Sequence, residues 1–274
     1  MAGFFEDIGK GLQQAADEAN KITSGVVKTV VKGTEDAAGA VFHEAGKALN
    51  LSYTKDLHDT ELLKLLVQCA SNCYSFNEND LKALPLKLTY KQEQNETSEN
   101  INNLLQYGVY EITSGKHKGK RVLAYRGTAS LMGILQDASL INPAMSPFGS
   151  LIHTTNQHAV QRANDHKPDF ITGHSLGAFI AECVCAATGI PGAAFNAPGP
   201  WAANPLNNCA VGDKYRGVPF EIHLVNTDLV SHYGSVAGPN SSHIGTPKWH
   251  DVPGRDDPLT SHAISTMVTI IHSL

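Results

Sequence analysis

The sequence predicts an α/β fold with a mostly parallel central sheet flanked by helices and an N-terminal amphipathic helical extension. Apolar strand-like runs alternate with helical periodicity from residue 56 onward, the pattern of a parallel sheet covered on both faces. One such run turns directly into a helix at Ser175, a serine between two nearby glycines. Residues 1–50 differ in kind, because they lack proline and repeat every 11 residues. We therefore expect an extension over 1–50 and one domain over 51–274.

The composition is that of a globular protein with a mild negative charge. Of the 274 residues, 42% are hydrophobic and 17% are charged, which excludes a disordered chain. The net charge of −5 argues against a nucleic-acid partner, which would require a basic face. The five cysteines form neither a disulfide framework nor a metal-ligand spacing, so we expect buried free thiols and neither metal nor cofactor. They are Cys69, Cys73, Cys183, Cys185 and Cys209.

The sequence carries no recognisable membrane span or secretory signal. No apolar stretch is long enough for a transmembrane helix. Glu6 and Asp7 stand where a signal peptide would need an apolar run. We therefore expect a cytoplasmic or lipid-surface-associated protein, with export by a non-classical route left open.

The 11-residue repeat places apolar side chains in columns along residues 1–50. Such a period gives about 3.67 residues per turn, so the columns of a straight helix form one stripe roughly 100° wide. Lys10, Lys21 and Lys32 recur on the opposite side. The apolar columns are Phe4, Ala15, Val26, Ala37 and Ala48; Phe5, Ala16, Val27, Ala38 and Leu49; and Ile8, Ala19, Val30 and Val41.

Three interpretations of this stripe remain open. The pattern resembles the lipid-surface helices of synucleins, perilipins and some stress-protective proteins, which implies a helix lying on a lipid surface. The stripe would also suit packing against the domain or a partner helix. Fraying is the third, because each glycine in a helix interior costs about 1 kcal/mol relative to alanine. These glycines are Gly25, Gly33, Gly39 and Gly46.

Periodicity and turn residues predict the elements of the domain in order. The first half is expected to contain a helix over 56–74 capped by Asp59 or Thr60, a polar loop with a short helix over 77–106, and a hairpin of strands 107–113 and 121–127. The second half is expected to contain a helix over 151–164, a strand over 169–173, a helix over 175–188, strands over 192–198 and 220–226, and a closing helix over 261–274.

The stretch GHSLG makes Ser175 a candidate nucleophile. A G-x-S-x-G pattern between a strand and a helix is typical of a strained turn that exposes a serine hydroxyl. The flanking glycines, Gly173 and Gly177, let neighbouring backbone approach without a clash at Cβ. The helix that starts there offers free N–H groups to a developing oxyanion. An ordinary glycine turn is the alternative.

A serine nucleophile needs an acid and a histidine, expected here in the order Ser…Asp…His. Asp228 follows the apolar strand 220–226, so its carboxylate is expected at the carboxyl edge of the sheet, although a helix-capping role is the alternative. The competing aspartates lie in polar loops: Asp213, Asp251, Asp256 and Asp257.

Of the 13 histidines, His262 is the best candidate for the base. It stands just before the closing helix, after a proline-containing loop from which an imidazole could reach the serine. His243 and His250 are the alternatives. His174 lies inside the motif and is expected to pack beside the site, pointing away from Ser175. For the oxyanion hole we expect the backbone N–H of Leu176 and a donor at Thr128, after the second hairpin strand.

Together these motifs resemble the class 3 lipase family, the fungal triacylglycerol-lipase-like α/β hydrolases. The resemblance covers about residues 55–274 and rests on the runs YRGT (125–128), GHSLGA (173–178), FNAPG (195–199) and VNTD (225–228). It implies an α/β-hydrolase fold, a triad of Ser175, Asp228 and His262, and an oxyanion hole at Thr128 and Leu176. The sequence departs from the family after Asp228, where Leu229 and Val230 replace the usual Pro-Val.

The apolar segment between the hairpin and the next helix has two interpretations. By the resemblance, residues 129–150 would form a lid that opens at a lipid surface. A packed helix and loop is the alternative. The apolar side chains concerned are Leu131, Met132, Ile134, Leu135, Leu140, Ile141, Met145 and Phe148.

The sequence thus predicts a serine carboxylic-ester hydrolase acting on acyl lipids, a lipase of the acylglycerol type. A phospholipase A or galactolipase, including one secreted as an effector, is the alternative on the same machinery. A non-catalytic lipid-surface protein on a hydrolase fold is the alternative from another class. The expected partners are a lipid or ester substrate and a lipid surface bound through residues 1–50.

Overall fold

The computed structural model describes six stretches of the chain, all of them within the predicted domain. They are residues 54–93, 105–127, 149–199, 217–232, 243–252 and 258–274. The extension over 1–50, Thr128 and nearly all of the expected lid over 129–150 lie outside the described residues.

The described residues form an eight-stranded mixed sheet in the order β1-β7-β6-β5-β4-β3-β2, with β8 also paired to β7. The pairs from β4 through β5, β6 and β7 to β8 are parallel, as is β1 with β7, whereas β2–β3 and β3–β4 are antiparallel. The strands are β1 (Thr54–Lys55), β2 (Leu86–Gln92), β3 (Tyr107–Ile112), β4 (Arg121–Tyr125), β5 (Phe170–His174), β6 (Gly192–Phe195), β7 (Val218–Val225) and β8 (Lys248–His250).

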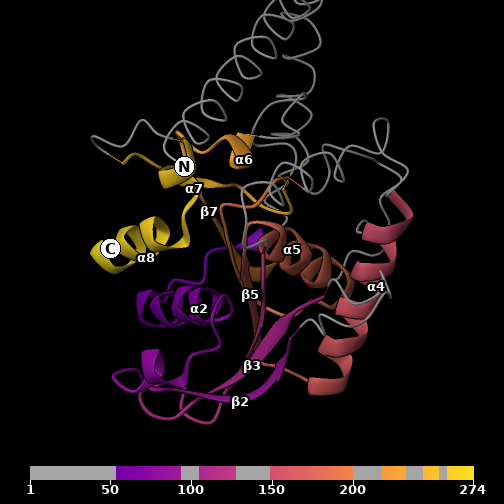
Figure 1. The fold of residues 1–274 in the computed structure, drawn as a ribbon, viewed down its shortest axis with the longest axis vertical. Coiled ribbons are helices and arrows are strands. Elements are labelled where there is room, and N and C mark those ends of the chain that lie inside the picture. Colours follow the sequence, from indigo (N-terminus) through magenta and orange to yellow (C-terminus); the bar gives the residue numbers. More distant parts are fainter. Residues whose placement is uncertain (1–53, 94–104, 128–148, 200–216, 233–242, 253–257) are drawn as a thin grey trace, which may run out of the picture. The chain divides into compact units, whose positions relative to one another are not determined.

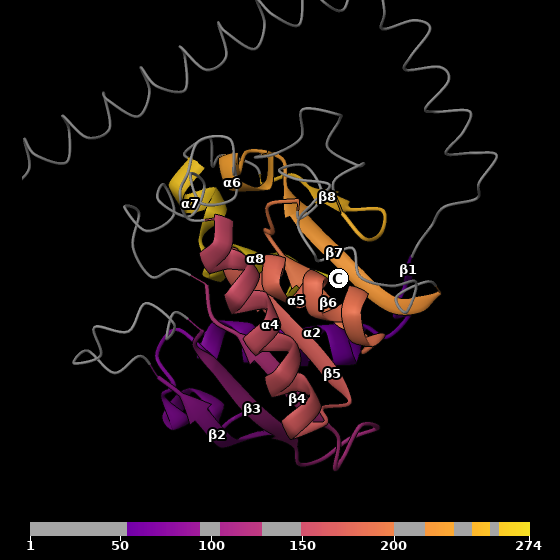
Figure 2. The ribbon, with the colours of Figure 1, turned by 90° about the vertical axis from the view of Figure 1, so that its right-hand side faces the viewer.

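Helices cover both faces of this sheet. Figure 1 shows α2 and α8 on one face and α4 and α5 on the other, and Figure 2 looks onto the α4 and α5 side. The helices are α2 (Thr60–Asn72), α4 (Gly149–His166), α5 (Leu176–Thr188), α6 (Leu229–His232), α7 (Pro258–His262) and α8 (Ile264–Ser273), with a 3-10 turn at Glu78–Leu81. This mixed sheet with flanking helices fits an α/β-hydrolase-like fold.

Two apolar layers form because successive side chains of a strand point to opposite faces. In β4, Val122 and Ala124 pack toward α2 and α8, whereas Leu123 and Tyr125 pack toward α4 and α5. All four are fully buried. A strand apolar at every position is what a sheet covered on both sides requires, and the sequence RVLAY meets that requirement at four of its five positions.

Helix α2 begins where the sequence indicated. The Asp59 side chain accepts a hydrogen bond from the Leu62 N–H at 3.1 Å and so caps the helix. Burial by itself would raise the pKa of Asp59. The hydrogen bonds that its carboxylate accepts from Lys116, from the Leu62 N–H and from His117 outweigh this effect and lower the pKa to about 2. The lysine and histidine come from the turn of the β3–β4 hairpin, so this one side chain ties α2 to that turn.

The predicted alternation of strands and helices from residue 107 onward is confirmed, and two details are corrected. Residues 86–92, expected as part of a polar loop, form the edge strand β2. Leu86 is the one residue of β2 that is buried. The strand lies at the edge of the sheet and pairs, among the described strands, with β3 alone, and most of its other residues are exposed to solvent. The closing helix is interrupted at Ala263, whose extended backbone separates α7 from α8.

The cysteine prediction holds in part. Cys69, Cys73 and Cys185 are buried free thiols, and burial raises the pKa of each. Cys183 is instead disulfide-bonded, which corrects the expectation of a free thiol at that position. None of the helices among the described residues is both long and apolar enough to cross a membrane.

Candidate active site

The carboxyl ends of four adjacent parallel strands carry the candidate site residues. Gly127 follows β4, Ser175 follows β5, Asn196 follows β6 and Asp228 follows β7. Because parallel strands end at the same edge of a sheet, one edge gathers residues that lie far apart in the sequence. Ligands of open α/β sheets bind outside this edge.

Ser175 occupies a strained turn between β5 and α5. Its backbone has φ 58° and ψ −129°, a left-handed φ that a residue with a Cβ seldom adopts. The turn is held at its start by a hydrogen bond from the Ser175 N–H to the Phe195 carbonyl at 3.0 Å. The helix then starts at once, since the Ala178 and Phe179 N–H groups both donate to the Ser175 carbonyl.

The two glycines beside Ser175 are required by close backbone contacts. A Cβ on Gly173 would overlap the Gly177 carbonyl, so the strand end and the first turn of α5 approach each other directly. A Cβ on Gly177 would overlap the Tyr125 carbonyl at the end of β4. Any larger residue at either position would therefore push α5 away from the sheet and move Ser175 with it.

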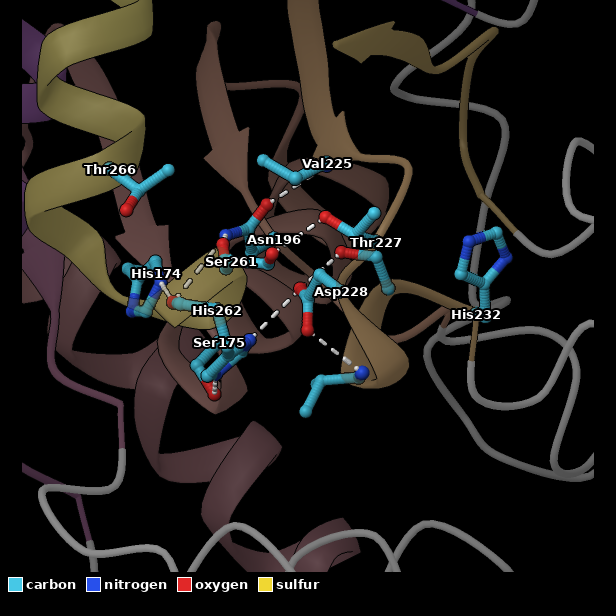
Figure 3. A network of polar contacts seen from close by, with 12 residues as sticks. His174, Ser175, Asn196, Val225, Thr227, Asp228, His232, Ser261, His262 and Thr266 are labelled. Atoms are coloured by element: carbon cyan, nitrogen blue, oxygen red, sulfur yellow. Dashed lines mark hydrogen bonds and ion pairs between the residues drawn. The ribbon is translucent and has the colours of Figure 1, made fainter. Parts of the chain in front are cut away.

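The structure brings His262 and Asp228 to Ser175. His262 Nε2 lies 2.8 Å from Ser175 Oγ, and His262 Nδ1 lies 2.9 Å from Asp228 Oδ2 (Figure 3). All three residues are buried. His262 is the last residue of α7, so its place just before α8 agrees with the position expected from the sequence.

The positions of the protons in this arrangement follow from which atoms can donate a hydrogen bond and which can only accept one. An ionised carboxylate is only an acceptor, so His262 must donate from Nδ1 to Asp228. In a neutral imidazole the other nitrogen is then an acceptor, so the hydroxyl of Ser175 donates to Nε2. This is the arrangement in which a histidine can withdraw a proton from a serine.

Asp228 is fixed by two further hydrogen bonds. Its Oδ1 accepts from the Val230 N–H at 2.9 Å, and its Oδ2 accepts from the Ser231 hydroxyl at 2.6 Å. Both donors belong to the short helix α6, so Asp228 caps α6 and contacts His262 at the same time. A helix-capping role for this aspartate and a role as the acid beside the histidine are therefore compatible.

The alternative candidates lie elsewhere. His243 pairs with the buried Glu182 on α5 at 2.8 Å. His250 lies 2.9 Å from His223, with which it stacks. Asp251 accepts a hydrogen bond from the Asn226 side chain at 2.6 Å. Each has its own partners, and the structure records no hydrogen bond from any of them to Ser175.

The region expected to hold an oxyanion lies next to Ser175. Leu176 is the first residue of α5, where N–H groups have no acceptor inside the helix. On the other side, a Cβ on Gly127 would lie 3.0 Å from the Ser175 Cβ, so the chain leaving β4 passes close to the serine. Thr128 is the next residue and lies outside the described residues.

Two residues to which the sequence assigned no role also hold the site together. Asn196, with a left-handed φ of 50°, accepts from the Val225 N–H at 3.2 Å and donates to the Ser261 carbonyl at 3.2 Å. It thus links the strand before Asp228 to the residue before His262. Tyr74, just after α2, hydrogen-bonds His174 at 2.7 Å. The run FNAPG includes Asn196, but no local pattern reveals the contacts of either residue, because their partners are far away in the chain.

The described residues contain no group of three or more His, Cys, Asp or Glu side chains arranged to hold a metal ion.

Comparison with known proteins finds distant structural likenesses. The crystal structure of M37 lipase has a TM-score of 0.36 and 13% identity, covering 65% of this chain and 64% of that one, so the chain spans about 64% of the length of this lipase. A structural analysis of two fungal esterases from Rhizomucor miehei gives a TM-score of 0.29 and 11% identity, covering 79% of this chain and 91% of that one. No family model and no curated protein sequence matches the chain.

The contact at Gly177 gives a test of the turn around Ser175. We expect Gly177→Ala to slow the reaction of Ser175 with a fluorophosphonate by about 10²-fold, because the added Cβ displaces the serine from its partners. Gly119→Ala is the matched control, since no atom lies within 4 Å of its Cβ position and its left-handed φ of 82° costs only local stability. An unchanged rate in folded Gly177→Ala protein would contradict this account of the turn.

Proposed function

We propose that this chain is a serine carboxylic-ester hydrolase acting on acyl lipids, with Ser175 as nucleophile, His262 as general base and acid, and Asp228 as the group that orients His262. The observation that carries the proposal is the continuous hydrogen-bonded path from Asp228 through His262 to a serine held in a strained turn. A structural serine would not need this backbone conformation, which costs about 1–3 kcal/mol.

The proposed reaction has two steps. Ser175 Oγ attacks the ester carbonyl carbon while its proton moves to His262 Nε2, and the resulting imidazolium is stabilised by Asp228. The bond to the alcohol oxygen then breaks, and His262 returns the proton to the leaving alcohol. In the second step a water molecule gives its proton to His262 and attacks the acyl group on Ser175. The carboxylic acid leaves, and the proton goes back to the serine oxygen.

We propose that backbone N–H groups on both sides of Ser175 stabilise the oxyanion. The Leu176 N–H lies at the N-terminus of α5, where the helix dipole also favours negative charge. The second donor is proposed at Thr128, because Gly127 already lies against Ser175.

Replacing the nucleophile is the primary test of this proposal. We expect Ser175→Ala to lower kcat on a soluble p-nitrophenyl ester by on the order of 10³-fold or more and to abolish fluorophosphonate labelling. Ser114→Ala, at an exposed hairpin serine, is the matched control and is expected to keep full activity. Labelled Ser175→Ala protein would contradict the assignment of the nucleophile. A wild-type protein that binds lipid but neither hydrolyses esters nor reacts with the probe would favour the non-catalytic alternative.

The acyl-lipid substrate class and the lipid surface are proposed from the sequence of the extension. In a helix, the 11-residue repeat of residues 1–50 would place a narrow apolar stripe opposite the lysines, a pattern suited to an interface rather than to a membrane span. A panel of triacylglycerols, phospholipids and galactolipids would establish the head group that the enzyme prefers.

A comparison of the full chain with residues 51–274 tests the role of the extension. We expect the shorter protein to bind phospholipid vesicles at least about tenfold more weakly in a sedimentation assay, because a surface helix binds through its buried apolar area. Hydrolysis of the soluble ester should be unchanged, since the described residues of the site all lie within 51–274. Equal vesicle binding by the two proteins would rule out the surface-helix interpretation.

A further inference from the structure

The backbone carbonyl of His262 is held by side chains rather than by a helix. It belongs to the break between α7 and α8, and the first hydrogen bonds of α8 go to the Ala263 carbonyl instead. His174 Nε2 lies 2.8 Å from the His262 carbonyl oxygen, and Asn196 Nδ2 donates to the same atom at 3.4 Å. Figure 3 shows His174 on the side of His262 away from Asp228. The main chain that carries the imidazole therefore depends on these donors for its position.

The protonation state of His174 follows from its partners. A carbonyl oxygen only accepts, so His174 must carry its hydrogen on Nε2. Burial and the neighbouring His262 hold the pKa of His174 well below its ordinary value, so the ring is neutral at physiological pH. Its Nδ1 is then an acceptor, and the hydroxyl of Tyr74 donates to it at 2.7 Å. Tyr74 thereby selects the one tautomer that can hold the His262 carbonyl.

A neutral ring at this position is compatible with the proposed reaction. The centroids of the His174 and His262 rings are 4.9 Å apart. A positive charge on His174 would therefore oppose the imidazolium that forms on His262. Tyr74 contributes without adding charge, because its hydroxyl is a neutral donor.

Tyr74 also contacts the chain that follows β4. A Cβ on Gly127 would overlap the Tyr74 hydroxyl, and the Arg126 guanidinium lies over the tyrosine ring at 5.8 Å from its centroid. The hydroxyl thus stands between the strand end beside Ser175 and the ring that holds His262. A side chain used only to fill the core would not need both contacts.

We propose that Tyr74 and His174 are positioning residues for His262: Tyr74 fixes the tautomer of His174, and His174 holds the backbone carbonyl of His262 so that its imidazole stays within reach of Ser175. This inference rests on the proposed function for its effect on rate and adds to it two residues outside the proposed triad.

Kinetics of Tyr74→Phe, His174→Phe and the double variant test the proposal on a soluble p-nitrophenyl ester. We expect Tyr74→Phe to lower kcat about three- to tenfold, the effect of losing one neutral hydrogen bond, with KM unchanged because neither residue is proposed to touch substrate. His174→Phe should lower kcat further. In its background Tyr74→Phe should have no additional effect, because the tyrosine acts through the histidine.

A matched control separates positioning from general destabilisation. Tyr107→Phe also removes a buried tyrosine hydroxyl that pairs with a histidine, His166 at 3.2 Å, but its ring packs toward α4. This variant is expected to keep the wild-type kcat. Additive losses from Tyr74→Phe and His174→Phe, a loss carried by KM, or an equal loss in Tyr107→Phe would each overturn the proposal.

A spectroscopic measurement tests the same proposal without relying on activity. In the full-length wild-type protein, the imidazole nitrogen-15 shifts of His174 should report a neutral ring protonated at Nε2 over the range from about pH 5 to about pH 8, in which an ordinary histidine titrates. Tyr74→Phe should allow the other tautomer to appear. Titration of His174 in that range, or no change in Tyr74→Phe, would overturn the proposal. An inactive wild type with these shifts would instead count against the proposed function alone.

Discussion

The left-handed backbone of Ser175 is the constraint on which the rest of the site depends. It allows β5 to turn into α5 within one residue, and it requires that both flanking glycines touch backbone directly. The cost of such a conformation, about 1–3 kcal/mol, must be met by the surrounding structure. Here α5 packs on β4, β5 and β6 and beside α4, and the Phe195 carbonyl at the end of β6 accepts a hydrogen bond from the serine N–H. The strain at one residue is thus sustained by the whole central part of the sheet.

The second requirement is that a histidine from the end of the chain stays fixed against that serine. His262 is the last residue of α7, and the first hydrogen bonds of α8 go to the Ala263 carbonyl rather than to that of His262. The structure supplies partners through side chains: His174 and Asn196 hold its carbonyl, and Asp228 holds its ring. These residues come from the ends of β5, β6 and β7, so the carboxyl edge of the sheet is what brings the site together. Precise placement on rigid elements is what proton transfer between heavy atoms requires.

The sequence predicted the parts of this arrangement that have a local pattern. The glycine-flanked serine, the apolar runs of β4, β5 and β7, and the cap at Asp59 are all set by neighbouring residues. The edge strand β2 was missed because its exposed side is polar, although Leu86, Leu88 and Tyr90 alternate with polar residues as in a strand. Tyr74 had no local signal at all, and Asn196 stood within the run FNAPG without any sign of its contacts. Their roles depend on partners 100 and 65 residues away, which only the folded chain reveals.

In the proposed reaction, Ser175 becomes acylated and is then freed by water. Intact-protein mass spectrometry after rapid acid quench, with excess p-nitrophenyl ester, tests this most directly. We expect a gain of one acyl group per chain, located by peptide mapping on the peptide that contains Ser175 and lost again once the ester is consumed. Replacement of His262 by alanine should slow both its appearance and its loss. An acyl group found on another residue during hydrolysis, or hydrolysis by Ser175→Ala protein at the wild-type rate, would contradict the proposed role of Ser175 as the nucleophile.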